Sequence, residues 1–131
     1  MARLEVHVVS PEANVYSGEG DMVVARGTDG MVGILPGHAP MLIELAVAPL
    51  RIFEGTTESE MILVDGGFLH VTPGDVTRVD VLAESAVLPA EVEAATARQR
   101  VEELRGTAGE EDHKGRTELS RWEMRAEHGS G

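Results

Sequence analysis

Residues 61–82 read MILVDGGFLHVTPGDVTRVDVL, and this stretch decides the fold class of the chain. It contains three short apolar runs, at 61–64, 68–71 and 76–82, which are separated by the turn signals Asp65-Gly66-Gly67 and Pro73-Gly74. Short apolar runs between glycine and proline turns predict antiparallel strands. The last run is apolar at both odd and even positions, which predicts a strand buried on both faces or a strand with a bulge.

The alternation of strand and turn continues from this stretch to the N-terminus. Leu4, Val6 and Val8 alternate with polar residues, as in a half-buried strand. Other segments repeat the pattern, with apolar runs at 22–25, 42–47 and 50–53 and turn signals at 17–18, 28–30, 36–37 and 54–55. The strands recur mostly every 7 to 12 residues, and no helical segment separates them. This pattern predicts an antiparallel β-sandwich, or flattened barrel.

The composition changes near residue 86, where a segment rich in Val, Gly and Pro is followed by one rich in Ala, Glu and Arg. Apolar residues then recur at helical spacings of 4, 3, 4 and 3, at Ala90, Ala94, Ala97, Val101 and Leu104. Pro89 suits the first position of this helix and Gly106 its end. A second, weaker helix is predicted over about 117–128.

We therefore expect a mainly β protein with an α appendage, in two domains. Residues 1–86 form the β-sandwich, and residues 87–131 form a C-terminal helical hairpin that ends in a frayed tail. The hairpin is expected to be marginally stable, because a seam made mostly of alanine buries little apolar surface.

The composition excludes several classes of function. The chain has 131 residues with 42% hydrophobic and 3% aromatic residues, and it contains no cysteine, so disulfide scaffolds, thiolate zinc sites and cysteine nucleophiles are excluded. Its 11 basic and 23 acidic residues give a net charge of −12, which predicts no binding to nucleic acid and no direct binding to anionic lipid. We expect no signal peptide and no transmembrane helix, because no apolar run is long enough.

The search for catalytic motifs finds none. Ser17 does not lie in a G-x-S-x-G elbow, and no Gly-Lys-Ser/Thr follows the glycines at 27, 30 and 33. His7, His38 and His70 do not have the spacing of metal ligands. We therefore expect a protein that is not an enzyme and that has no catalytic residue, no cofactor and no metal site. On these grounds alone, a free-standing β-sandwich module that binds a small ligand or peptide remains an alternative, and a deep apolar cleft would distinguish it.

A series of motifs resembles the epsilon subunit of the bacterial-type F-type ATP synthase. The most specific is GMVGILPGHAPML at 30–42, and the others, in the order of that family, are VVSPE at 8–12, VYSGE at 15–19, DGGFLHV at 65–71 and VLAESA at 81–86. The resemblance covers about residues 4–86 well and about 89–104 loosely. Beyond Gly106 it is only architectural.

The resemblance implies a non-catalytic subunit of the rotating central stalk. In that family the sandwich binds the gamma subunit and sits on the ring of membrane c subunits, so that proton translocation is coupled to ATP synthesis. The C-terminal helices approach the alpha and beta subunits and restrain ATP hydrolysis, here as a partial inhibitor. The implied location is the cytoplasmic face of the bacterial cell membrane, as a peripheral part of the F1 sector that reaches the membrane only through the complex.

The resemblance also implies an interface along the most specific motif. Its candidate residues are Asp29, Gly30, Met31, Gly33, Pro36, Gly37, His38 and Pro40, with His38 near gamma and the turn at 29–31 on the c-ring. Alternatively, the prolines and Gly37 only fix an irregular connection in which His38 packs locally. Many family members carry an acidic residue where this chain has Met31, so in this chain the contact with the c-ring must come from Asp29 or from apolar packing.

The C-terminal segment is implied to be a regulatory tail. Its candidate contact residues are Lys114, Arg116, Leu119, Arg121, Trp122 and Arg125, which would meet an acidic loop of the beta subunits. The alternative is an ordinary solvated helix. Some family members bind ATP through an arginine on the first helix, but Thr96 occupies that place here, so we do not expect regulatory ATP binding.

Overall fold

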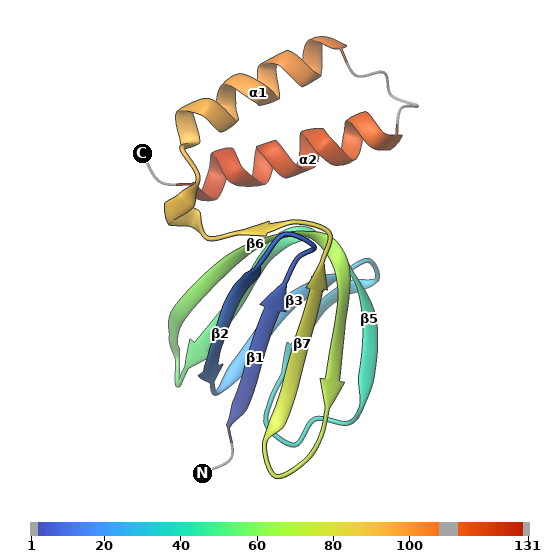
Figure 1. Cartoon of the computed structure of the whole chain (residues 1–131), viewed down its shortest axis with the longest axis vertical. Coiled ribbons are helices and arrows are strands. Elements are labelled where there is room, and N and C mark those ends of the chain that lie inside the picture. The colour runs from blue at the N-terminus through green and yellow to red at the C-terminus, as the bar shows by residue number, and fades with distance from the viewer. Residues whose placement is uncertain (1–2, 108–112, 130–131) are drawn as a thin grey trace. The chain divides into compact units, whose positions relative to one another are not determined.

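The computed structural model describes residues 3–107 and 113–129, with side chains described at 3–105 and 119–129. It divides into two units, Met1–Ala86 and Val87–Gly131, each with its own internal packing (Figure 1). Within the described residues, no helix combines the length and apolar character needed to span a membrane.

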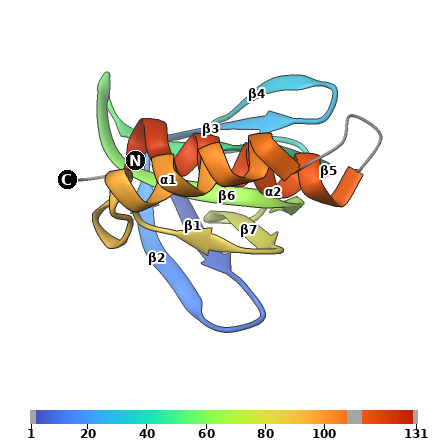
Figure 2. The ribbon, with the colours of Figure 1, turned by 90° about the horizontal axis from the view of Figure 1, so that it is seen from above.

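The first unit is a β-sandwich. Its strands are β1 (Leu4–Val9), β2 (Asn14–Gly20), β3 (Met22–Gly27), β4 (Gly30–Ile34), β5 (Met41–Glu54), β6 (Thr57–Thr72), β7 (Thr77–Ala83) and the short β8 (Ala86–Val87). The main path of the sheet is β2-β1-β7-β6-β5-β3-β4. Figure 2 shows the two layers from above, with β3 and β4 on one side and β1, β2 and β7 on the other. The predicted sandwich is confirmed, but the sheet is not closed into a barrel, because β2 and β4 are its two ends.

Strands β5 and β6 belong to both layers because they bend. They stay paired from Met41↔Val71 to Glu54↔Thr57, with one register shift between Ile52 and Phe53. The separate strands predicted on either side of Asp65-Gly66-Gly67 are therefore wrong, since β6 passes through this segment. Gly66 and Gly67 have φ values of +70° and +112°, which bend the strand without ending it. The predicted turn at residues 17–18 is also wrong, because these residues lie inside β2.

The core of the sandwich follows the predicted alternation of buried and exposed residues. Leu4, Val6 and Val8 are fully buried on β1, and Val79 and Val81 are buried on β7. Strand β1 pairs with β7 in parallel, whereas its other neighbour, β2, is antiparallel. The prediction that the run at 76–82 is buried on both faces or bulged is wrong. Strand β7 buries alternate residues only and pairs with both neighbours without a register shift.

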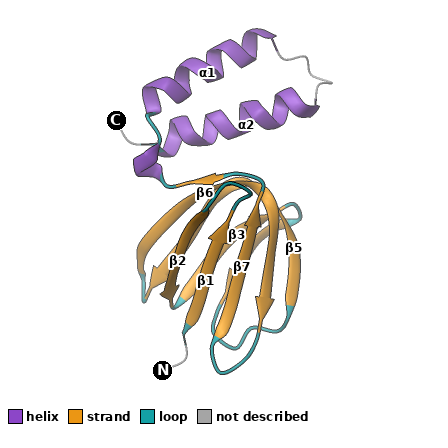
Figure 3. Cartoon of the chain, viewed as in Figure 1, coloured by secondary structure: helices purple, strands orange, loops and turns teal. Residues whose placement is uncertain are grey.

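The second unit is the predicted helical hairpin, formed by α1 (Ala94–Thr107) and α2 (His113–His128), which Figure 3 shows in purple. The first helix does not begin at Pro89 as predicted. A short 3-10 turn, η1 (Pro89–Glu91), comes first, and Val92 is then extended with φ −107° and ψ 126°, which interrupts the helix. Ala94, Ala97 and Val101 are buried on one face of α1, as the seam predicts.

Candidate functional site

The loop at 35–40, in the centre of the specific motif, is tied down by hydrogen bonds but remains exposed. Gly37 adopts φ +86°, and its amide donates a hydrogen bond to the Thr77 hydroxyl oxygen at 2.7 Å, which ties the loop to the start of β7. The His38 amide donates to the Leu35 carbonyl at 3.1 Å, and His38 Nδ1 lies 2.8 Å from the Ala39 carbonyl oxygen. His38 is thus half-buried on its own loop, while Gly37, Ala39 and Pro40 are partly or fully exposed.

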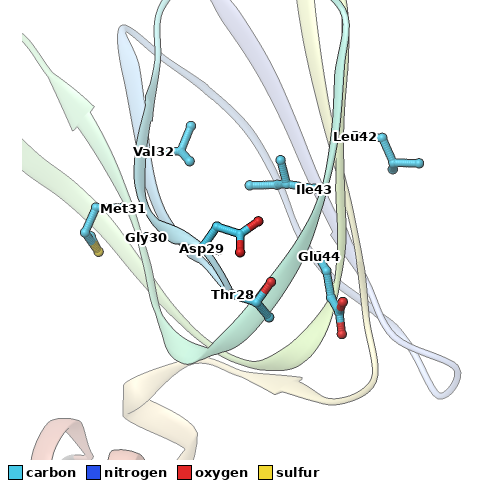
Figure 4. Close-up of a pocket in the computed structure, with 9 residues that line it drawn as sticks. Thr28, Asp29, Gly30, Met31, Val32, Leu42, Ile43 and Glu44 are labelled. Atoms are coloured by element: carbon cyan, nitrogen blue, oxygen red, sulfur yellow. The ribbon is translucent and has the colours of Figure 1, made fainter.

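The turn between β3 and β4 forms a second candidate surface. Gly30 has φ +135°, and Met31 is 64% exposed. The turn and the facing part of β5 line a shallow depression of about 300 Å³, formed by residues 27–32 and 42–44. Figure 4 shows the Asp29 carboxylate and Ile43 directed toward the space between the turn and β5, whereas Met31 points away from it.

The structure does not bring the two predicted sets of interface residues into one site. Asp29, Gly30 and Met31 lie at the first end of β4, and the loop with His38 follows its last residue, Ile34. Five strand residues at about 3.3 Å each place the two ends roughly 15 Å apart. Gly33 lies between them on β4, exposed, and a Cβ added there would meet no atom within 4 Å. The motif therefore supplies two surfaces instead of one.

A third surface was not predicted from the sequence. Three large apolar side chains, which we call the apolar patch, are exposed on one face of neighbouring strands: Leu42 (67%) on β5, Phe68 (49%) on β6 and Leu82 (58%) on β7. Phe68 is the direct cross-strand partner of Leu82 on β7. On β5 the direct partner of Phe68 is Glu44, so Leu42, two residues before Glu44, lies diagonal to Phe68. An open groove of about 390 Å³ runs beside Phe68 and Leu82, with Val9 and Pro11 also in its wall.

One sequence signal pointed to the apolar patch. The run at 76–82 is apolar at both parities, and the structure shows that Leu82 belongs to the outward parity of a strand with only one buried face. Monomeric soluble proteins rarely expose contiguous apolar patches larger than roughly a few hundred Å². A strand that is apolar at both parities can therefore indicate an interface on its outward face, and not only a strand buried on both faces.

The candidate tail residues are engaged inside the hairpin where the structure describes them. Two guanidinium groups lie over the Trp122 ring, that of Arg100 at 5.6 Å and that of Arg125 at 5.0 Å from its centroid. Arg105 of α1 pairs with Glu123 of α2 at 3.4 Å. Leu119 and Arg121 are half-buried, and Lys114 and Arg116 belong to α2 with side chains outside the described set. In this conformation Trp122 is not an exposed anchor.

Neither metal nor triphosphate is favoured by the described side chains. Among them, no three His, Asp or Glu residues are placed to hold a metal ion. A groove of about 430 Å³ between α1 and α2 is lined by the carboxylates Glu102, Glu123 and Glu127 and the guanidinium groups of Arg98 and Arg105. Carboxylates outnumber cations three to two there, which disfavours a polyanion.

Comparisons with known proteins agree with each other. Residues 3–89 match the family described as ATP synthase, delta/epsilon chain, beta-sandwich domain. The ATP synthase epsilon chain of Brevibacillus brevis is 46% identical over 106 residues, 78% of this chain and 77% of the relative. That of Thermobifida fusca is 38% identical over 127 residues, 95% and 91% of the two chains. A chain in the Euglena gracilis mitochondrial ATP synthase has the same fold, with a TM-score of 0.76 at 23% identity over 95% of this chain and 79% of that one.

Proposed function

Because this chain belongs to the ATP synthase epsilon chain family, we propose that it is the non-catalytic central-stalk subunit that couples proton translocation through the c-ring to ATP synthesis. In this role the sandwich, residues 1–86, binds the gamma subunit and rests on the c-ring. The helical hairpin, residues 87–131, approaches the alpha and beta subunits and partially inhibits ATP hydrolysis. The protein acts at the cytoplasmic face of the bacterial membrane, which it reaches only through the complex.

The observation that carries this proposal is the apolar patch. A subunit that transmits torque needs a firm attachment, and apolar surface buried between stiff bodies supplies one. Leu42, Phe68 and Leu82 project from three adjacent strands of one sheet, so the patch is held without flexible loops. We assign gamma binding to this patch, together with the exposed loop that contains His38.

The turn at 29–31 is the proposed contact with the c-ring. Met31 is exposed and supplies apolar area, whereas the Asp29 carboxylate supplies the one negative charge of the turn. The contact therefore depends on Met31 packing more than on an ion pair. This assignment places the turn and the His38 loop at the two ends of β4, whereas Leu42 of the apolar patch lines the same depression as the turn, so the proposed c-ring and gamma contacts adjoin there.

The hairpin is the proposed regulatory element. Trp122 is covered by Arg100 and Arg125, so the tail must open before this ring can contact another subunit. The α1 face is built on Ala94 and Ala97, whose burial stabilises the hairpin weakly. Easy opening and a limited contact area together support partial inhibition.

The test of the proposed function is assembly with gamma. The doubly substituted Phe68→Ser/Leu82→Ser chain should lose at least about tenfold in affinity for an alpha-beta-gamma complex that lacks this subunit, since both residues are central in the proposed interface. Val76→Ser is the matched control, because Val76 is 48% exposed but lies outside the apolar patch. Circular dichroism checks that all variants fold.

Unchanged affinity in the folded double variant would remove the apolar patch from the gamma interface. Failure of the unsubstituted chain to bind the complex would reject the central-stalk function itself. The alternative of a free-standing ligand-binding module gains no support from the groove beside Phe68, which is open at the surface and not a deep cleft.

A further inference from the structure

The break between η1 and α1 lies at Val92, whose backbone is extended. The signals that start a helix precede this residue. Pro89 occupies the first position of η1, and the Leu88 amide donates a hydrogen bond to Glu91 Oε1 at 3.0 Å, as at the N-terminus of a helix. By contrast, the first turn of α1 carries no acidic residue. The start signals therefore belong to one helix over residues 89–107, which the structure divides at Val92.

The hydrogen bonds on either side of Val92 follow helical patterns. The Val92 amide donates to the Pro89 carbonyl at 3.1 Å, which is a bond of the 3-10 type. The Ala97 amide donates to the Glu93 carbonyl at 3.1 Å, which is a bond of the α type. A change of the backbone around Val92 to helical angles would therefore connect η1 and α1 into one helix over 89–107, which we call the joined helix.

The apolar seam shows what the break changes. Ala94 and Ala97 are buried on α1, whereas Ala90, the first residue of the same pattern, is exposed. In the joined helix Ala90 would return to the seam, about 40° from Ala94 around the axis. Val92 would lie about 200° from Ala90, on the opposite face. In the structure, however, Val92 is buried, with 8% of its surface exposed. The extended backbone and the joined helix thus bury different residues.

The end of α2 covers the Val92 side chain. Gly129 directly follows α2, and its amide donates to the Arg125 carbonyl at 2.8 Å. A Cβ added to Gly129 would lie 2.9 Å from Val92 Cγ1 and 3.2 Å from Val92 Cβ, so the two residues are in close contact. Only a residue without a side chain allows this approach. The joined helix would remove the contact, because it would carry the Val92 side chain to the face opposite the seam.

We propose that Val92 is a hinge with two states and that the end of α2 selects between them. While α2 is docked, the contact with Gly129 keeps Val92 buried and extended. When α2 leaves, Val92 loses this cover, and the chain gains helical hydrogen bonds by forming the joined helix. The two states exclude each other, so opening of the hairpin and lengthening of α1 are coupled. A β-branched residue suits the hinge, because it favours an extended backbone and lowers helix propensity only slightly.

The first experiment measures the Cα chemical shifts of residues 91–93 by NMR in the full-length chain, since these shifts move in opposite directions in extended and helical backbone. Gly129→Leu should change the values at Val92 and Glu93 from extended to helical, because a leucine side chain cannot fit beside Val92. Ser120→Leu is the control. It adds the same side chain at an exposed position of α2, nine residues before Gly129, and should leave the values extended. Extended or random-coil values in Gly129→Leu would overturn the inference.

The second experiment uses Val92→Ala, which favours the joined helix without a clash. It removes both the side chain that contacts Gly129 and the β-branch that disfavours a helix. Thr96→Ala is the matched control, because Thr96 is also β-branched but is exposed and already lies inside α1. Only Val92→Ala should move the chemical shifts of residues 92–93 toward helical values. Equal shifts at these residues in both variants would overturn the hinge.

The effect of the hinge on ATP hydrolysis rests on the proposed function, in which the open hairpin is the inhibitor. Val92→Ala should then lower hydrolysis by the alpha-beta-gamma complex about two- to threefold relative to Thr96→Ala, as a difference in helix propensity allows. Helical chemical shifts at residues 92–93 with unchanged hydrolysis would leave the hinge standing and count against inhibition by the hairpin. Lower hydrolysis with extended values at these residues would instead reject the hinge and support the inhibitory role.

Discussion

Gly67 is the glycine of the described sandwich residues at which both backbone conformation and space most strongly exclude a side chain. It has φ +112°, and a Cβ at this position would collide with the Leu82 carbonyl oxygen and lie 2.8 Å from Ala83 Cα. Only glycine allows β6 to bend while it stays in close contact with β7. The same contact sets Phe68 opposite Leu82, so this glycine supports the apolar patch as well as the bend.

We predict that Gly67→Ala destabilises the sandwich by about 3 kcal/mol or more, because the clash is with backbone and cannot be relieved by a side-chain movement. Gly66→Ala is the matched control. Its φ is +70° and its nearest Cβ neighbour is at 3.6 Å, so a loss of about 1 kcal/mol is expected. Urea denaturation measures both values, and equal losses for the two variants would contradict the steric argument.

His38→Ala should separate the two interpretations of the motif loop. The His38 side chain hydrogen-bonds only within its loop among the described residues, so the expected stability loss is about 1 kcal/mol or less. Binding to gamma should weaken. A large loss of stability with unaltered binding would instead favour local packing as the role of this residue.

The sequence predicts single turn residues well where a turn is local. The glycines at 30, 37 and 55 have positive φ values in predicted turns. It fails where the outcome depends on a distant strand: Gly66 and Gly67 look like a turn, yet β5 holds β6 on both sides of them. The apolar patch was missed for a related reason, since alternation identifies two faces of a strand but not which one is left open to solvent.

At the scale of elements, two strands carry both layers of the sandwich. β5 has 14 residues and β6 has 16, well beyond the usual five or six of a strand. Each was predicted as two shorter strands, because local patterns record where a chain bends but not whether pairing continues through the bend. The bend lets one pair of strands connect the two layers, which stiffens the proposed attachment to gamma.

The stack of Arg100 on Trp122 is predicted to hold α1 and α2 together. Trp122 is the only tryptophan of the chain, so its fluorescence reports on this contact directly. Arg100→Ala should shift the emission to longer wavelength and increase quenching by acrylamide. Loss of a cation–π contact of about 0.5–1 kcal/mol should also lower the melting temperature of the hairpin.

Arg98→Ala is the control for this measurement. Arg98 lies on the same helix and lines the groove together with Glu123 and Glu127, and it is not one of the two guanidinium groups over the Trp122 ring. The emission of this variant should match that of the unsubstituted chain. Equal shifts in both variants would show that the change reflects loss of arginine charge and not of the stack.

At the scale of the whole molecule, the two units are expected to be independent in stability. The sandwich has its own core, in which Leu4, Ile52 and Leu69 are fully buried. A chain that ends at Ala86 should therefore fold with its sheet intact and keep its affinity for gamma. Circular dichroism and denaturant unfolding check the fold. An unfolded product would place the boundary elsewhere.

Removal of Thr107–Gly131 should raise ATP hydrolysis by the soluble complex, because it removes the proposed inhibitory contact. Arg121→Ala/Arg125→Ala should reproduce part of this increase, with Ser120→Ala, at an exposed position of α2, as the control. Because Arg125 lies over the Trp122 ring, its loss can change the Trp122 emission directly, so Arg121→Ala alone, with unchanged emission, separates a lost contact from a loosened hairpin. If neither the removal of Thr107–Gly131 nor the Arg121→Ala/Arg125→Ala substitution changes ATP hydrolysis, the tail is not an inhibitor.

The parallel pairing of β1 with β7 also affects how the protein is made. Leu4 pairs with Thr77 and Val9 with Leu82, so the first strand has to wait for the last long strand to be synthesised. Until then β1 has only β2 as a neighbour, and a hairpin alone is marginally stable in water. Such distant pairing slows folding, since a long loop must close first. The sandwich should consequently fold after the ribosome has released β7, and nascent chains arrested before residue 77 should remain sensitive to protease.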